Sequence, residues 1–159
     1  IASWANGNRV VVEDTTLLLT GITVTDIDIP VLASGSALSS LSVQIAVENG
    51  QVSLVSPAEL MLYTEGDITQ GNRLLNFSGS VEDVNRAFAQ LQYRPNANWF
   101  GDELLKITVN DQGNEGAGGA LSHTRTVVVT VTPVNDIPTI SVPSRSVEVL
   151  EDRDRKSVV

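Results

Sequence analysis

Seven oxygen-bearing side chains stand near the ends of expected strands, where they could bind a cation. They are carboxylates and one carboxamide: Glu13, Asp26, Asp28, Asp102, Asp111, Asn135 and Asp136. Calcium takes about six to eight oxygen ligands, most of them carboxylate or carbonyl oxygens. Because acids gathered without a cation would repel one another, convergence of these groups favours a bound calcium ion. The alternative is that Asp and Asn stand at turns for backbone reasons alone.

Counting strand directions sorts these residues into two groups at opposite ends of the molecule. If the first strand runs down to Glu13, the next returns upward to Asp26 and Asp28. The strand over residues 103–110 also runs upward, and the strand over 124–132 runs back down. The upper group is therefore expected to contain Asp26, Asp28 and Asp111. The lower group is expected to contain Glu13, Asp102, Asn135 and Asp136.

Each group supplies only part of the ligand set that calcium usually takes, so each is expected to be a half-site. A neighbouring unit of the same chain would supply the remaining ligands. Two further acids near the lower group, Asp14 and Glu103, are expected to face solvent.

The residues that catalysis needs are harder to assemble. His123 is the single histidine, and a Ser–His–Asp arrangement requires that base to be fixed against a nucleophile. A glycosidase needs two carboxylates across a cleft, whereas the spare acids Glu59, Glu65 and Asp67 are interpreted as a solvated face. Neither a G-x-G-x-x-G motif nor a P-loop is present. We therefore expect that the chain is not an enzyme.

Composition excludes several classes of partner. The 159 residues carry 10 Lys and Arg against 19 Asp and Glu, a net charge of −9. Nucleic acids and anionic membranes both favour basic surfaces, so neither is an expected partner. The chain has no cysteine, which excludes disulfides and thiolate chemistry, and it has no apolar run long enough to span a bilayer. It begins with Ile1 instead of Met, and we interpret it as a piece of a longer protein.

Hydrophobic alternation predicts the strands that position these groups. Apolar residues recur with period two over residues 41–48, 103–110 and 124–132. Asn49-Gly50 suits a type I′ turn, so residues 51–55 are expected to return as the second arm of a hairpin. The predicted core is Leu41, Val43, Ile45, Val47, Leu75, Phe77, Leu105, Ile107, Val109, Val127, Val129 and Val131.

One stretch indicates a helix. Ser80 can cap the amide of Asp83, and Val84, Ala87 and Phe88 then recur at helical spacing. Trp99 and Phe100 are expected to plug the core under a loop. About seven to nine short strands with one short helix predict an all-β fold, a Greek-key sandwich.

An internal echo predicts a tandem arrangement. The acidic strand end at Glu13-Asp14 recurs as Glu151-Asp152. We therefore expect residues 1–136 to form one repeat and residues 137–159 to form a linker and the first strand of the next, truncated repeat. Residues 154–159 do not continue the pattern, and we interpret them as an artefact of a truncated transcript, with a genuine charged terminus as the alternative.

An ordered set of short motifs carries a resemblance to a known family. The motifs are Glu13-Asp14-Thr15, Asp26-Ile27-Asp28, Gly79-Ser80, Leu91-Gln92-Tyr93-Arg94-Pro95, Asn98-Trp99-Phe100-Gly101-Asp102, Val109-Asn110-Asp111 and Val134-Asn135-Asp136-Ile137-Pro138. Together they resemble the cadherin-like tandem repeats of large extracellular and surface proteins, a group that includes chondroitin sulfate proteoglycan repeats. The resemblance implies an extracellular or cell-surface immunoglobulin/cadherin-like β-sandwich whose junctions are stiffened by calcium.

Three functions are compatible with these observations. The leading hypothesis is a calcium-binding module that acts as a rigid spacer or adhesion element, with neighbouring repeats, surface proteins or glycans as partners. The alternative is a carbohydrate-binding accessory module of an extracellular enzyme, which would need a flat aromatic face from Trp4, Tyr63 and Trp99. A metal-free sandwich whose acidity only keeps it soluble is the third.

Overall fold

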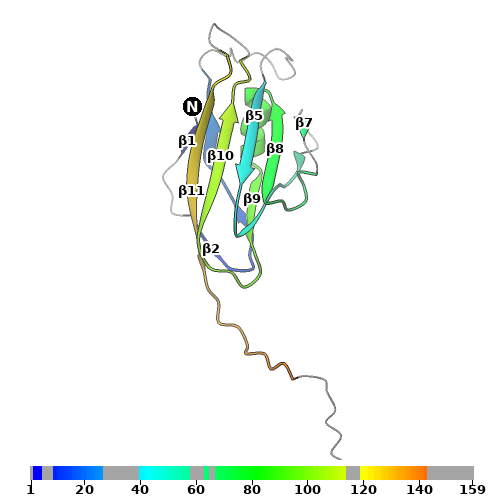
Figure 1. Cartoon of the computed structure of the whole chain (residues 1–159), viewed down its shortest axis with the longest axis vertical. Coiled ribbons are helices and arrows are strands. Elements are labelled where there is room, and N and C mark those ends of the chain that lie inside the picture. Colours follow the sequence, from blue (N-terminus) through cyan, green and yellow to red (C-terminus); the bar gives the residue numbers. More distant parts are fainter. Residues whose placement is uncertain are drawn as a thin grey trace, which may run out of the picture.

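The computed structural model describes residues 2–4, 9–26, 40–57, 63–64, 67–113 and 119–142. The fold is an all-β sandwich with one short helix, as the alternation predicts. Figure 1 shows the strands running along the long axis of the molecule, with the chain leaving the lower end as an extended segment after β11 (Ser122–Thr132). We call the end where β11 begins the upper end, and the end where it finishes the lower end.

A six-stranded sheet forms the first layer. Its neighbouring strands are antiparallel, except that the first strand of the sheet runs parallel to β11. The order is β2 (Arg9–Val12), β11, β10 (Gly101–Asn110), β5 (Leu41–Ala46), β8 (Leu74–Gly79) and β7 (Tyr63–Thr64).

The second layer combines two small sheets and the helix. The three-stranded sheet has the order β3 (Leu17–Leu18), β9 (Leu91–Pro95) and β6 (Gly50–Leu54). The two-stranded sheet pairs β1 (Ala2–Trp4) with β4 (Ile22–Val24). The helix α1 (Val81–Phe88) lies behind β5 and β8 in Figure 1 and covers the upper part of the core.

The core lies between the layers and matches the prediction. Every predicted core residue is buried, from Leu41 on β5 to Val131 on β11. The second layer contributes Leu54, Leu91 and Tyr93 to the same cluster. The ring centroids of Phe77 on β8 and Phe88 on α1 lie 6.3 Å apart in an edge-to-face arrangement, which joins the helix to the larger sheet.

The helix begins as predicted. The N–H of Asp83 donates to the Ser80 hydroxyl at 3.1 Å, and that hydroxyl donates to the Asp83 carboxylate at 2.7 Å. Asp83 is buried, and its other carboxylate oxygen lies 3.5 Å from the Arg86 guanidinium one turn later. Acidic side chains in the first turn also complement the helix dipole.

The predicted hairpin at Asn49-Gly50 is wrong, because β5 and β6 belong to different layers. Strand β5 pairs with β10 on one side and β8 on the other, which leaves no edge for β6. Strand β6 pairs instead with β9. Neither Asn49 nor Gly50 has a positive φ. Gly50 is required by packing, since a Cβ there would lie 2.4 Å from the Tyr93 ring.

Candidate functional site

At the lower end, Glu13 closes the sandwich where the chain leaves it. Its backbone N–H donates to the carbonyl of Thr132 at 3.0 Å, and its carboxylate accepts the N–H of Val134. The side chain is only 4% exposed. Glu13 therefore ties the end of β2 to the end of β11.

The other members of the predicted lower group do not join Glu13. Asp102 is exposed at the start of β10, where its carboxylate accepts the hydroxyl of Thr130 at 2.8 Å. Because side chains alternate along a strand, Asp102 lies on the outer face of the sheet, whereas Glu13 points between the layers. Asn135 and Asp136 are exposed on the extended segment after β11.

Glu103 is a buried carboxylate near the start of β10. Expected to face solvent, it is fully buried and accepts the backbone N–H groups of Glu48 at 2.9 Å and Asn49 at 2.6 Å. The Tyr93 hydroxyl lies 3.4 Å from it, and burial, with the nearby Glu103 charge, raises the pKa of Tyr93. The sequence could have predicted this burial, because Glu103 stands two residues before the buried Leu105 and alternate residues of a strand face the same side. Asp14 is exposed as expected, and its carboxylate accepts the N–H of Asn98 at 3.2 Å.

At the upper end, the structure places Asp26 after β4 and Asp111 after β10. One carboxylate oxygen of Asp111 accepts the N–H of Leu121 at 2.7 Å and that of Gly113 at 2.9 Å. These bonds favour the ionised carboxylate and so hold the pKa of Asp111 below its usual value. Asp111 therefore closes the loop between β10 and β11.

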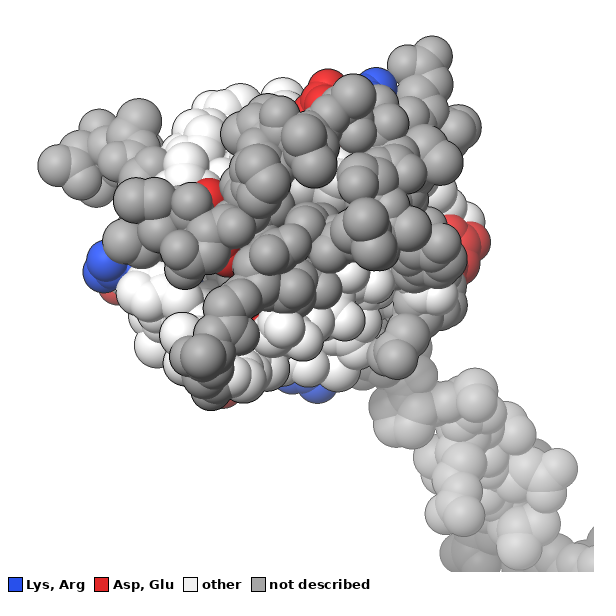
Figure 2. Space-filling view, turned by 90° about the horizontal axis from the view of Figure 1, so that it is seen from above, with Lys and Arg blue, Asp and Glu red and all other residues white. Residues whose placement is uncertain are grey.

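The structure describes two members of the upper group, Asp26 and Asp111. Asp28 lies outside the described residues, so its place beside Asp26 and Asp111 stays a prediction. In the part of the chain that the structure describes, no group of three or more His, Asp or Glu side chains is placed to hold a metal ion. Figure 2, which looks down on this end, shows red acidic atoms at several separate places.

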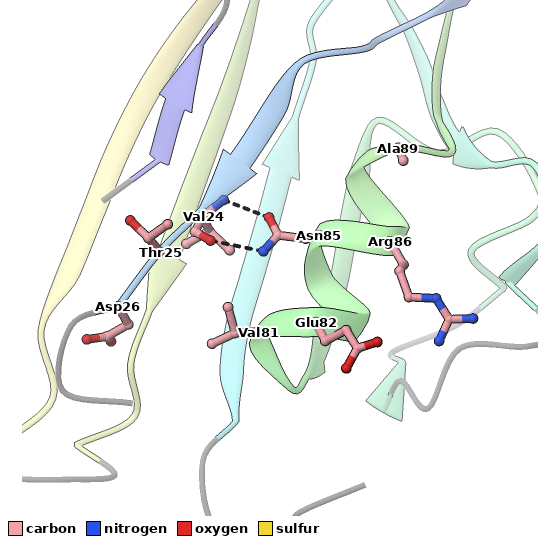
Figure 3. Close-up of a pocket in the computed structure, with 8 residues that line it drawn as sticks. All are labelled: Val24, Thr25, Asp26, Val81, Glu82, Asn85, Arg86 and Ala89. Carbon is pink, nitrogen blue, oxygen red and sulfur yellow. Dashed lines mark hydrogen bonds between the residues drawn. The ribbon is translucent and has the colours of Figure 1, made fainter. Parts of the chain in front are cut away.

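An open groove of about 500 Å³ lies between β4 and the helix (Figure 3). Figure 3 shows the Asn85 carboxamide turned from α1 toward β4. It accepts the Val24 N–H at 2.8 Å and donates to the Val24 carbonyl at 3.0 Å, as a neighbouring strand would. Val24 and Val81 give the groove apolar walls, and the lining also includes Asp26 and Glu82.

The outer face of the six-stranded sheet presents a second surface whose side chains are described. Four apolar residues on it form what we call the apolar strip: Val10, Val12, Leu104 and Val128. Leu104 and Val128 face each other across β10 and β11, and they are 57% and 51% exposed. Val10 and Val12 continue the strip on β2 with exposures of 49% and 44%. The remaining outward positions carry mostly Thr, Ser, Asn and Gln.

The histidine and the aromatic residues named above as candidates for catalysis or sugar binding do not form a site among the described residues. His123 is exposed near the start of β11. Trp99 is half-buried and packs against the core, as expected of a plug, whereas Phe100 is 59% exposed and does not share that role. The side chains of Trp4 and Tyr63 lie outside the described residues.

Comparisons with known proteins correct the resemblance drawn from short motifs. Curated proteins and solved structures give no match. The family model of the GEX2 domain, described as the Protein GAMETE EXPRESSED 2 domain, matches residues 32–118. The resemblance to cadherin-like and proteoglycan repeats is therefore wrong. Several of its described motifs, such as Gly79-Ser80 and Val109-Asn110-Asp111, lie at strand ends, where Asp, Asn and Gly recur for backbone reasons in any sandwich.

Among the described residues, no helix is both long and apolar enough to cross a membrane. The family match spans more than half of the chain, from the segment before β5 to the loop before β11, and so covers β5, β6, β7, β8, α1, β9 and β10. The name of the family refers to a protein expressed in gametes. The chain belongs to the GEX2 domain family.

Proposed function

We propose that this chain is a non-catalytic recognition module of an extracellular protein on the gamete surface. We propose further that it binds a partner protein through the outer face of the six-stranded sheet. Family membership supports the gamete context. The apolar strip is the observation that carries the binding role.

The strip has the character of an interface core. Its four side chains are between 44% and 57% exposed on neighbouring strands, so a partner could remove all of them from water at once. Each Å² of apolar surface removed from water favours association by about 25 cal/mol, and the ordering and desolvation costs of binding offset part of that gain. Hydroxyl groups of Thr126, Thr130 and Thr132 border the strip on β11 and supply a rim for hydrogen bonds.

Charge supports a protein partner over other classes. The chain carries a net charge of −9, yet the outward positions of β2, β5, β8, β10 and β11 hold only Asp102 and Lys106 as charged residues. A nucleic acid or an anionic membrane would favour a basic face. Cores of protein interfaces are depleted of charge, and this face shares that property.

The carbohydrate-binding alternative has less support. It needs a flat aromatic platform, and Trp99, the one candidate whose side chain is described, packs against the core. Phe100 is exposed beside it, but a single ring makes a small platform.

A spacer role is the second part of the proposal. The chain leaves β11 as an extended segment in which Ile137 is 87% exposed and Ile140 is 91% exposed. These apolar side chains, together with the echo at Glu151-Asp152, support a following unit in which residues 137–159 are the linker and first strand. Neighbouring units of the same chain are then its partners at the two ends.

We also propose a calcium-binding site at the upper end of the sandwich. Asp26 and Asp111 lie at the same end of the sandwich, and Asp28 follows Asp26 closely in sequence. The lower group does not support a site, because Asp102 and Glu13 point to opposite sides of the sheet.

A pair of matched variants tests the recognition role. Leu104→Glu places a charge in the apolar strip, and Leu18→Glu places the same charge at a 47% exposed leucine on the smaller sheet. The whole chain is labelled and its binding to intact gametes is measured. Leu104→Glu is expected to weaken binding about tenfold or more, as loss of a central interface contact does. Leu18→Glu should bind like the unaltered chain. Equal binding by both variants would reject the strip as the recognition surface.

A further inference from the structure

Strand β8 carries the one Asn-x-Ser/Thr motif of the chain, Asn76-Phe77-Ser78. This tripeptide, with any residue but proline in the middle, is the acceptor for N-linked glycans in proteins that enter the secretory pathway. Ten other asparagines stand in the sequence without a hydroxyl residue two positions later. The motif therefore singles out Asn76.

The strand presents the two functional residues of the motif on one face. Phe77 is 3% exposed and packs inward against Phe88. Because side chains alternate along a strand, Asn76 and Ser78 both lie on the outer face, where each is half-buried. A glycan on Asn76 would therefore project away from the core, and the fold could form with the sugar in place.

The described neighbours of Asn76 on the outer face are uncharged polar side chains. Its cross-strand neighbour on β5 is Gln44, which is exposed, and the next outward pair along the two strands is Ser42 with Ser78. None of these outward side chains is charged or aromatic. Beyond β8, the short strand β7 pairs only with Phe77 and Ser78 in the part of the chain that the structure describes.

We propose that Asn76 is an N-glycosylation site. The inference rests on the extracellular part of the proposed function, since the transfer occurs only in the secretory pathway. The co-reactant is an oligosaccharide linked through a diphosphate to a membrane lipid. The Asn76 Nδ2 forms a bond to the sugar C1, the bond from C1 to the diphosphate oxygen breaks, and the lipid diphosphate leaves with the electron pair. The amide gives up one proton, and no redox change occurs.

The position also divides the outer face into two parts. Neighbouring strands lie about 4.8 Å apart, so Asn76 on β8 stands about 10 Å from β10 and farther from β11 and β2. A glycan at Asn76 covers the side of the face formed by β5 and β8. The apolar strip on β10, β11 and β2 lies two or more strands away from this attachment point.

The test uses the whole chain expressed behind a secretion leader in mammalian cells, with both the medium and the cell lysate analysed. The unaltered chain is expected to migrate more slowly than its mass predicts, and peptide N-glycosidase F should remove the difference. Mass spectrometry should then find Asn76 converted to Asp. Asn76→Gln and Ser78→Ala should each abolish the shift, whereas Ser78→Thr should keep it. Ser42→Ala, which alters the partner of Ser78 outside the motif, is the matched control and should also keep it.

Either result is decisive for the site. A chain that enters the secretory pathway without an enzyme-sensitive shift would overturn the proposal, and so would a shift that survives in Asn76→Gln. Analysis of the lysate keeps the test valid if a variant is retained in the cell. Because the leader supplies entry to the pathway, failure here leaves the recognition role untouched. Loss of the recognition role, seen as normal gamete binding by Leu104→Glu, would leave the glycosylation site standing.

Discussion

The buried carboxylate of Glu103 accepts the backbone N–H of Asn49 at 2.6 Å, and this bond joins β10 to the turn that carries the chain from one layer to the other. The same carboxylate accepts the N–H of Glu48 at 2.9 Å. The turn cannot pair as a hairpin does, because its flanking strands lie in different sheets. Glu103 supplies the acceptors that a hairpin partner would have supplied.

Replacing Glu103 with glutamine should therefore destabilise the sandwich. Glutamine keeps the shape but turns one acceptor into a donor that faces a backbone N–H. Because hydrogen bonds to a charged group are worth more than neutral ones, we expect Glu103→Gln to lower the free energy of unfolding by about 1.5–3 kcal/mol. Urea denaturation measures this. Glu82→Gln on the exposed side of α1 is the control and should change stability by less than about 0.5 kcal/mol. Similar values for the two variants would show that Glu103 does not hold the turn.

Asn85 should be required for docking of the helix on β4. Asn85→Ala removes both bonds to Val24 and leaves the N–H and carbonyl of that residue without this partner. We expect a loss of about 1–3 kcal/mol of stability and faster hydrogen exchange at the Val24 amide. Glu82→Ala on the same helix is the control. Unchanged protection of Val24 in Asn85→Ala would contradict the role of the carboxamide.

Stability at acid pH should depend on Asp111. Its pKa is lowered in the folded state by the N–H groups of Leu121 and Gly113, so its contribution is fully present above the unfolded pKa of about 3.9. That contribution is lost as pH falls through the lower, folded pKa. Asp111→Asn keeps an acceptor oxygen but does not titrate, so its unfolding temperature should fall less steeply with acid.

A second group provides a check on the acid prediction. The pKa of Asp67 is also lowered, mainly by the hydroxyl and N–H of Thr69. Adding Asp67→Asn to Asp111→Asn should flatten the acid dependence further. Identical pH profiles for the unaltered chain and both variants would refute the assignment.

Calcium should act at the upper end if the proposed site is real. The isolated chain is expected to bind calcium weakly and to gain melting temperature with added calcium, since binding to the folded state alone stabilises it. Asp28→Asn should reduce the gain. Asp102→Asn, on the outer face, should leave it unchanged. The site would be ruled out if titration calorimetry detected no heat of calcium binding and added calcium left the melting temperature unchanged.

Much of the fold could be predicted because burial follows period two in the long strands. That rule placed Ile45, Ile107 and Val129 in the core, and a capping pattern placed Ser80 at the start of the helix. The hairpin failed because a two-residue turn says nothing about which layer the next strand joins. That choice is made by strands distant in sequence, here β8, β9 and β10.

The candidate site was harder to predict than the fold. Strand direction fixes the end of the molecule at which a residue lies, and it placed Asp26 and Asp111 at one end. It does not fix the side of the sheet. Asp102 and Glu103 are adjacent on β10, and because side chains alternate along a strand, Asp102 faces solvent and Glu103 faces the core. The apolar strip was missed because outward valines on β2 and β11 look like core residues in a chain rich in valine.

The parallel pairing of β2 with β11 has a mechanical consequence. The pairs run from Arg9 with Val129 to Val12 with Thr132, and Glu13 fastens the same end to Val134. The chain enters this pair at the upper end and leaves it at the lower end (Figure 1). A pull on the start of β2 against the end of β11 therefore loads the bonds between these strands in shear, so that they share the force and must rupture together. Under tension along that direction, this pair would be the element that resists extension of the sandwich.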